Sequence, residues 1–453
     1  MDEREALLQL SKEELVAIIL DLQQHIRELH DKIDRPPKTP TNSSTPPSQG
    51  RKANRRRGRV GGGAKPGHTG KSRAKVAADV VVALRVEVCA QCGAEVSQAR
   101  TSSPRQRVVG SSQVVEIPPV APVVIEAQRC AVDCPVCGHT QAAAYPAGME
   151  PARVFGPRLE ALVHYLHLAH PLGYARLFGL DISLGALVNA VRRVQKPFAE
   201  AADAILERIR ASAVIGSDET GARVAGETSS PQNAWLWVVQ TPDNACYTIA
   251  PTRAPRVLEA VMDQACPTVW VSDLAKAQLK QPALYRQICL AHQPRDLQYA
   301  IDADRCAWAY RVQALLWRAQ RLGHHRNQMP PHHYGRQVRA VEHALDALLM
   351  QVPRSAWSQN LRRRFREHRQ HLFPFLYLPN VPPTNNAAEQ ALRNAVIDRK
   401  VTGGFRAEWG ATAYANVISV IETARRRGQD ILHTLMDLLS QPFDLLLSFT
   451  PAR

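Results

Sequence analysis

The sequence predicts an α/β fold built around a mixed β-sheet, and the order of its apolar segments is the main observation. Three short apolar segments come first without a helical pattern between them, which indicates an antiparallel meander. Two more follow, each after a helical segment, and a helical crossover makes such strands parallel to a neighbour. The expected strands cover 213–217, 234–240, 245–250, 268–272 and 288–290, and the first crossover helix covers 256–264.

Three strands, a helix, a strand, a helix and a strand is the order of a ribonuclease-H-like core. We expect this core over residues 213–427, with the helical and basic stretch 296–372 inserted into it. The region 150–212 has apolar repeats typical of helices that pack beside such a core, and a helical tail at 428–453 follows it.

Residues 1–34 carry a seven-residue repeat of large apolar side chains. Isoleucine at one position of the repeat and leucine at the other favour a parallel two-stranded coiled coil. We therefore expect the protein to form a homo-oligomer through this helix; a helix packed against its own chain is the alternative. The repeat consists of Leu8, Leu15, Leu22 and Leu29, with Ile19, Ile26 and Ile33 offset by four positions.

Residues 35–78 form a basic segment rich in Pro, Ser, Thr and Gly, a composition that cannot bury a core and is expected to be disordered when free. It holds twelve Lys or Arg residues and no acidic residue, in a chain of formal net charge +16. Such a segment suits a polyanion, above all nucleic acid, by releasing condensed counterions; a linker that charge merely keeps soluble is the alternative. Its densest cluster is Arg55, Arg56, Arg57 and Arg59.

Residues 79–147 contain two Cys-x-x-Cys pairs, each followed by glycine: Cys89 with Cys92, and Cys134 with Cys137. The glycine permits a tight turn that directs backbone amides at thiolate sulfur. Four thiolates give closed tetrahedral Zn²⁺, which stabilises a domain too small for its own core. We expect a small zinc-ribbon module with a structural ion; Cys130 could compete as a ligand, and two unrelated thiol pairs are the alternative.

The chain has no run of 18 apolar residues, so no membrane span is expected. Its acidic start, Met-Asp-Glu-Arg-Glu, is unlike a secretory signal peptide. We therefore expect a cytoplasmic protein, in which paired cysteines favour zinc over disulfides.

Three carboxylates stand where a ribonuclease-H-like order brings side chains together. Asp218 follows the first expected strand and Asp273 the fourth, and these two strands are neighbours in such a sheet. Glu389 lies about one turn inside a helix that opens after a proline pair, with Thr384 or Asn385 as the expected N-cap. Each residue alone also has a structural explanation, as a turn residue for Asp or a helix-dipole partner for Glu.

Distinctive motifs run in one order along nearly the whole chain. After the leucine-rich helix come 42–48 (Asn-Ser-Ser-Thr-Pro-Pro-Ser), 63–70, the paired Cys-x-x-Cys module, 218–220, 235–238, 289–292 (Cys-Leu-Ala-His), 385–389, 397–400 and 421–424. This order resembles the insertion-sequence 66 family of bacterial transposases, which are DDE enzymes.

The resemblance implies that Asp218, Asp273 and Glu389 are the metal-binding, catalytic triad of a transposase that cleaves the DNA of an insertion sequence and transfers the strand. Carboxylate oxygens suit Mg²⁺ or Mn²⁺. The resemblance also suggests accessory transposition proteins, besides the DNA of the element ends and the target. We expect DNA phosphates to be held by the basic segment, the zinc module, the helices of 150–212, and Arg393, Arg399 and Lys400.

The sequence departs from the family pattern at two places. Asp273-Leu274-Ala275 replaces the usual Asp-Gly-Tyr, and 293–295 (Gln-Pro-Arg) keeps one arginine of the basic pair that follows the Cys-x-x-His motif. Neither change removes a predicted metal ligand, so the expected chemistry is unchanged.

Two other functions fit part of the same sequence. A non-catalytic zinc-ribbon DNA-binding protein, such as an inactive or domesticated transposase, would share the basic segment, the zinc pairs and the coiled coil, but it would not need three carboxylates in these contexts. A ribonuclease-H-like nuclease would cut DNA without joining it.

Overall fold

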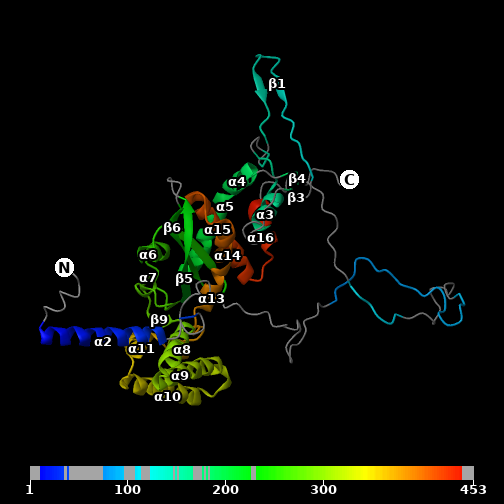
Figure 1. The fold of residues 1–453 in the computed structure, drawn as a ribbon. Helices are drawn as coiled ribbons and strands as arrows, with labels where there is room; N and C mark the ends of the chain where they lie inside the picture. Colours follow the sequence, from blue (N-terminus) through cyan, green and yellow to red (C-terminus); the bar gives the residue numbers. More distant parts are fainter. Residues whose placement is uncertain are drawn as a thin grey trace. The chain divides into compact units, whose positions relative to one another are not determined.

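The computed structural model of the chain (Figure 1) divides into a large and a small unit. The large unit comprises Met1–Arg51, Ala127–Leu177 and Asp181–Arg453, and the small unit comprises Lys52–Glu126 and Phe178–Leu180. The structure describes residues 11–34, 38–39, 75–95, 108–113, 123–145, 148–149, 153–166, 176–177, 180–181, 184–225 and 231–440.

A five-stranded mixed sheet lies at the centre of the large unit, in the order β7-β6-β5-β8-β9. β5 is antiparallel to β6, and β6 to β7, whereas β8 is parallel to both β5 and β9. The predicted α/β class and the antiparallel meander are therefore confirmed. The elements are β5 (Val214–Ala225), β6 (Pro231–Gln240), β7 (Ala245–Ala250), α6 (Arg256–Met262), β8 (Val269–Ser272), α7 (Lys276–Leu279) and β9 (Tyr285–Ile288).

Four of the five strands differ from their expected bounds, and the differences at β5 and β9 bear on the site. β5 continues to Ala225 because its antiparallel partner β6 runs beside it over that whole length, while its parallel pairing with β8 ends at Gly216. The expectation that Asp218 follows the first strand was therefore wrong, since this residue lies within β5. β9 ends before the expected segment does, and the N–H of Leu290 instead donates to the carbonyl of Pro383 at 2.9 Å.

Side chains alternate between the two faces of the sheet, and each face has its own core. The back face carries Trp237 and Trp270, which are buried against helices α5, α6 and α16. The front face carries Leu236 and Val238 of β6, which are buried against α13, α14 and α15. The bounds of these helices are α5 (Gln195–Arg210), α13 (Asn386–Ala391), α14 (Arg393–Thr402), α15 (Glu408–Arg426) and α16 (Ile431–Ser440).

α15 lies along β7, at one edge of the sheet, and contributes side chains to both cores. Two of its hydroxyl groups take the place of a neighbouring strand. The N–H of Tyr247 donates to Ser419 Oγ at 2.9 Å, and the N–H of Ala245 donates to Thr423 Oγ1 at 3.1 Å. The backbone groups of this edge strand are thereby partly satisfied, although no strand lies beside them.

A helical insertion separates β9 from α13. Its core is built around Leu316, Val341 and Phe365, and it continues onto the sheet through Val269 and Val271 of β8. The insertion is therefore packed on the sheet rather than tethered to it. Its elements are α8 (His292–Asp304), α9 (Ala307–His324), η2 (Arg326–Gln328), α10 (Pro331–Met350), α11 (Ala356–Glu367), η3 (Arg369–His371) and α12 (Pro374–Tyr377).

A buried ion-pair cluster joins the helices that precede the sheet. Glu160 of α3 is fully buried and binds Arg153 at 2.9 Å and Arg193 of α4 at 2.8 Å. Two guanidinium groups compensate the burial of this carboxylate, which would otherwise be costly. The elements of this part are β1 (Ala131–Asp133), β2 (Thr140–Ala142), α3 (Pro157–His164), β3 (Arg176–Leu177), β4 (Leu180–Asp181) and α4 (Leu184–Arg193).

The N-terminal helix α2 (Lys12–Asp34) begins with a capping box. The N–H of Glu14 donates to Ser11 Oγ at 3.2 Å, and the N–H of Ser11 donates to Glu14 Oε2 at 2.8 Å. Val16, Ile19 and Leu22 are exposed, so an apolar seam of the helix faces solvent. The coiled coil stays a prediction, and its first residues, 1–10, lie outside the described part of the chain.

Among the helices that the structure describes, none combines the length and apolar character needed to cross a lipid bilayer.

Replacement of Leu316 by Ala should lower the stability of the insertion by about 2–5 kcal/mol, because Leu316 is fully buried and its loss leaves a cavity. The matched control is Tyr310→Ala on the same helix, where the side chain is 62% exposed and the expected change is below about 0.5 kcal/mol. Denaturant unfolding followed by circular dichroism measures both. Equal effects of the two substitutions would contradict the packing of α9 described above.

Candidate active site

Asp218 of β5 and Asp273, the residue after β8, lie close to the point where the pairing of these two parallel strands ends. The last paired residues are Gly216 of β5 and Val271 of β8, and each aspartate comes two residues further along its chain segment. Side chains that are two or four residues apart on a strand point to the same face of the sheet. Asp273 comes two residues after Val271, whose side chain packs in the core of the insertion, and Asp218 comes four residues before Ala222, which packs on the front face. Both carboxylates therefore point toward the front face, at the place where β8 ends and β5 continues without a parallel partner.

Glu389 reaches this place from α13. Ala388 and Ala391 of that helix are buried on the front face against β6, which turns the intervening part of the helix toward the sheet. The negative charges of Asp273 and Glu389 both act on Asp218 and raise the pKa of its carboxyl group. Within this acidic cluster, their charges reach Asp218, but among the described residues the ligand atoms of the three carboxylates do not all lie within 4.8 Å of one another, so the shared metal site stays a prediction.

Asn385 holds the start of α13 in position. Its side-chain Nδ2 donates to the carbonyl of Ser217 at 2.8 Å, and its backbone N–H donates to Cys289 Sγ at 3.1 Å. The residue is at the N-cap position, as expected, but its side chain does not cap the helix. The expected capping role was therefore wrong, because the amide group instead bonds the strand residue that precedes Asp218.

The cluster has an excess of negative charge. Burial raises the pKa of Asp218 well above its usual value, and the charges of Asp273 and Glu219 raise it further. Asp218 Oδ1 accepts the N–H of Glu219, and Asp273 Oδ1 accepts the N–H of Ala275, each at 2.9 Å. Within the described residues no ion pair reaches Asp218 or Asp273. A set of carboxylate oxygens held together without a compensating cation fits a hard divalent ion.

A polar network that sequence reasoning missed lies on the back face, directly behind the cluster. The buried carboxylate of Glu219 pairs with Arg253 at 2.5 Å and accepts from Gln278 Nε2 at 2.6 Å. Gln278 in turn accepts from Ser217 Oγ, which accepts from Trp270 Nε1 at 2.8 Å. This network holds the side chain of Glu219 on the back face and pairs it with a cation, although its charge still contributes to the raised pKa of Asp218.

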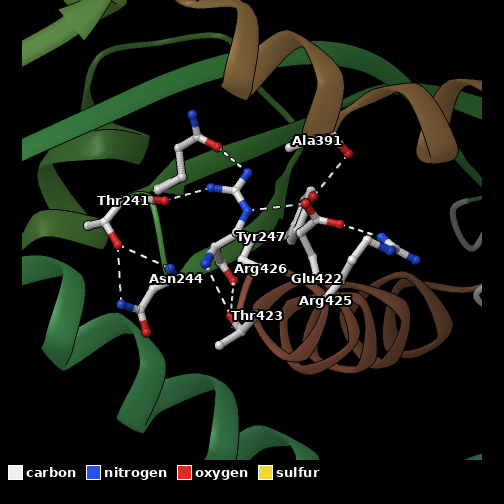
Figure 2. A network of polar contacts seen from close by, with 10 residues as sticks. Thr241, Asn244, Tyr247, Ala391, Glu422, Thr423, Arg425 and Arg426 are labelled. Carbon is white, nitrogen blue, oxygen red and sulfur yellow. Dashed lines mark hydrogen bonds and ion pairs between the residues drawn. The ribbon is translucent and has the colours of Figure 1, made fainter. Parts of the chain in front are cut away.

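A second network fixes α13 from its other end (Figure 2). The hydroxyl of Tyr247 on β7 donates to the carbonyl of Ala391, the last residue of α13, at 2.9 Å. Figure 2 also shows the contacts of α15 with the β6–β7 turn beside this bond. There Arg426 donates to the carbonyl of Thr241 at 2.6 Å and to Glu422 Oε1 at 3.1 Å. The helix that carries Glu389 is thus tied to the sheet at both ends.

A basic groove of about 360 Å³ lies further along β5 from the cluster, on the side of α14. Arg223, Arg399 and Lys400 line it, and Arg399 also donates to the carbonyl of Gly221. Arg399 and Lys400 were expected from sequence to contact phosphate, whereas Arg223 was not singled out. Arg393 is exposed at the start of α14, and the predicted basic cluster at 55–59 lies outside the described residues.

Each Cys-x-x-Cys pair forms a turn suited to a metal-bound thiolate. The backbone N–H groups of Cys92 and Gln91 lower the pKa of Cys89, and those of Cys137 and Val136 lower the pKa of Cys134. The glycine after each pair has a positive φ, 74° at Gly93 and 71° at Gly138. The two pairs belong to different units of the structure, so the predicted four-cysteine Zn²⁺ site stays a prediction.

A mixed five-stranded sheet with helices on both faces and acidic residues gathered at neighbouring parallel strands is compatible with the core of a transposase. A family model described as "Transposase IS66 family" matches residues 153–413. The chain therefore belongs to the IS66 family of transposases, and the resemblance stated from sequence is confirmed. No curated protein matches the sequence.

In the absence of metal, Asp218→Asn should raise the thermal midpoint at neutral pH by a few degrees. Because the pKa of Asp218 is raised in the folded state, its ionisation costs stability as pH rises through that pKa, and asparagine removes this cost. The advantage should vanish as the pH falls below about 4, the ordinary pKa of an Asp side chain, because the carboxyl group is then protonated in the unfolded chain as well.

Thermal scans in a chelating buffer at several pH values measure this difference. Asp243→Asn, at an exposed residue of the β6–β7 turn, is the matched control and should change little. A variant at Asp218 that is less stable than the parent at neutral pH would show that the acidic cluster is not under electrostatic strain.

Proposed function

We propose that this chain is a DDE transposase, which cleaves the ends of an insertion sequence and joins them to target DNA with the help of divalent metal. Its catalytic core would be ribonuclease-H-like, with Asp218, Asp273 and Glu389 as ligands of Mg²⁺ or Mn²⁺. The observation that supports this most is the placement of Asp218, Asp273 and the helix of Glu389 beside one another from widely separated parts of the sequence, so that, besides burial, the charges of the other two raise the pKa of Asp218. The strand order of the sheet agrees with such a core.

Mg²⁺ held by these carboxylates would neutralise the phosphate charge and activate water or a 3′-hydroxyl group for in-line attack. The protein supplies the rigid frame for that chemistry. Asp218 and Asp273 are fixed by the pairing of β5 with β8, and Glu389 by the bonds of Asn385 and Tyr247. Positioning of this kind removes the need to order the ligands during the reaction.

The basic groove would guide the DNA backbone past the cluster. Arg223, Arg399 and Lys400 present positive charge beside the strand that bears Asp218. Guanidinium groups bind phosphate through paired hydrogen bonds, and an ammonium group binds it as a point charge. The basic segment, the zinc-ribbon module and a coiled coil of α2 would add further DNA contacts and bring two copies together, in the bacterial cytoplasm and beside accessory transposition proteins.

Purified protein should nick and join element-end DNA only when Mg²⁺ or Mn²⁺ is present. Asp218→Asn, Asp273→Asn and Glu389→Gln should each lower cleavage by more than about 100-fold, because loss of even an outer partner of a metal ligand typically costs 10–100-fold. Binding of the same DNA should persist, since no phosphate-binding group is removed.

The matched control for these variants is Glu367→Gln, at an exposed position near the end of α11, which should cleave like the parent. Gel analysis of labelled DNA separates cleavage from strand joining. Full cleavage by any of the three variants would remove that residue from the proposed site, and cleavage without joining would make the protein a nuclease.

DNA affinity should depend steeply on salt. If six to ten phosphates are contacted, the affinity should fall about 10³–10⁵-fold between 50 and 200 mM salt. Lys400→Ala should reduce the slope of log affinity against log salt by about 1, as expected for one lost phosphate contact. Lys280→Ala, at an exposed lysine after α7, is the control, and an equal loss in both variants would place the DNA path elsewhere than the groove.

A further inference from the structure

Cys289, His292 and Glu389 bring one sulfur, one nitrogen and one oxygen ligand atom to within 4.8 Å of one another. Over the described residues, no other three such side chains come this close together, the carboxylates of Asp218, Asp273 and Glu389 included. Cys289 follows β9, His292 begins α8, and Glu389 comes from α13. The group therefore joins three segments of chain at the corner of the sheet where the acidic cluster lies.

The backbone around Cys289 has the geometry of a metal-binding turn. The N–H groups of Ala291 and His292, two and three residues further on, point at the Cys289 thiol, and the N–H of Asn385 adds a third donor at 3.1 Å. The thiols of Cys89 and Cys134 receive the same pair of donors, from the residues two and three positions further on. The Cys-x-x-His segment is thus built like the two Cys-x-x-Cys turns, with imidazole in place of the second thiol.

The carboxylate of Glu389 supplies an independent indication. Its Oε1 atom is buried and accepts no hydrogen bond, although it lies 3.5 Å from His292 Nε2. A buried carboxylate oxygen without a donor is costly, and such an atom in a native protein calls for an ion or another partner. A cation between Glu389, His292 and Cys289 would satisfy it.

We propose that Cys289, His292 and Glu389 bind one Zn²⁺ ion, at a site that is separate from the proposed Mg²⁺ site and shares Glu389 with it. Thiolate and imidazole select zinc over magnesium, which takes oxygen ligands. Three protein ligands leave one of the four tetrahedral positions for water. Zinc bonds of about 2.0–2.3 Å require the ligand atoms to approach somewhat more closely than they do without the ion.

Zinc binding at this site displaces a proton. Burial raises the pKa of the Cys289 thiol to about 11, so without an ion the group is a neutral thiol. On binding, the S–H bond breaks, a Zn–S bond forms and the proton leaves to solvent, while His292 binds through a neutral imidazole nitrogen.

The ion would fix the direction of Glu389. One carboxylate oxygen would be held by zinc against the β9–α8 corner, which leaves the other free for the acidic cluster around Asp218. This role goes beyond the proposed transposase activity and does not depend on it, because the measurement is of bound metal and not of DNA cleavage.

The test is the zinc content of the full-length protein after dialysis against buffer that contains Mg²⁺ and traces of Zn²⁺. Cys289→Ser and His292→Ala should each lose one equivalent of zinc relative to the parent, while zinc in the paired-cysteine module is unaffected. Cys246→Ser and His325→Ala are the matched controls. Cys246 is a buried thiol and His325 an exposed imidazole, neither belongs to the group of three, and both variants should keep the zinc content of the parent.

A second measurement guards against misfolding of the cysteine variant. The side chain of His292 is 23% exposed, so its replacement leaves most of the core intact. Zinc added after chelation should raise the thermal midpoint of the parent more than that of His292→Ala. Unchanged zinc content in both variants, or an equal rise of the midpoint in parent and His292→Ala, would overturn the proposal and leave a hydrogen bond from His292 to Glu389 as the role of this residue.

Discussion

The hydrogen bonds of Asn385 are the constraint on which the candidate site depends. One joins α13 to the carbonyl of Ser217 and the other joins it to the sulfur of Cys289, so a single buried residue connects β5, the end of β9 and the helix of Glu389. Asp218 and Asp273 need no such link, because both follow closely on the paired residues of neighbouring strands. The third carboxylate approaches them from a distant part of the sequence, across a large helical insertion, and this docking sets the start of its helix while the bond of Tyr247 to Ala391 sets the end.

Assembly of like charges at this point works against folding and is compensated elsewhere. Burial and neighbouring charge both oppose ionisation of Asp218, whereas Glu219, the next residue, is neutralised by Arg253 on the other face of the sheet. Consecutive side chains of β5 point to opposite faces of the sheet. The unpaired carboxylate of Asp218 is thus kept apart from the paired carboxylate of Glu219. An unpaired acidic group beside a paired one is a common mark of a functional site, because charge that is costly to the apo protein favours a bound cation.

Much of this arrangement could be predicted from sequence. The order of strands followed from apolar segments and the turns between them. The first and fourth strands were expected to be neighbours, which placed Asp218 near Asp273, although Asp218 lies within its strand and not at the end of it. Contacts between distant residues could not be predicted. Glu219 forms an ion pair with Arg253, and Asn385 bonds Ser217 from 168 positions away. No local sequence pattern identifies either partner. The length of β5 was also hidden, since β6 rather than its own composition extends it.

Other parts of the chain lie against the free sides of both outer strands of the sheet. Hydroxyl groups of Ser419 and Thr423 occupy the free side of β7, and η3 and α12 lie against β9. The free sides of β7 and β9 are therefore largely occupied, which disfavours growth of this sheet by a strand from another molecule. Copies of the protein that come close together are thus protected from joining edge to edge through this sheet.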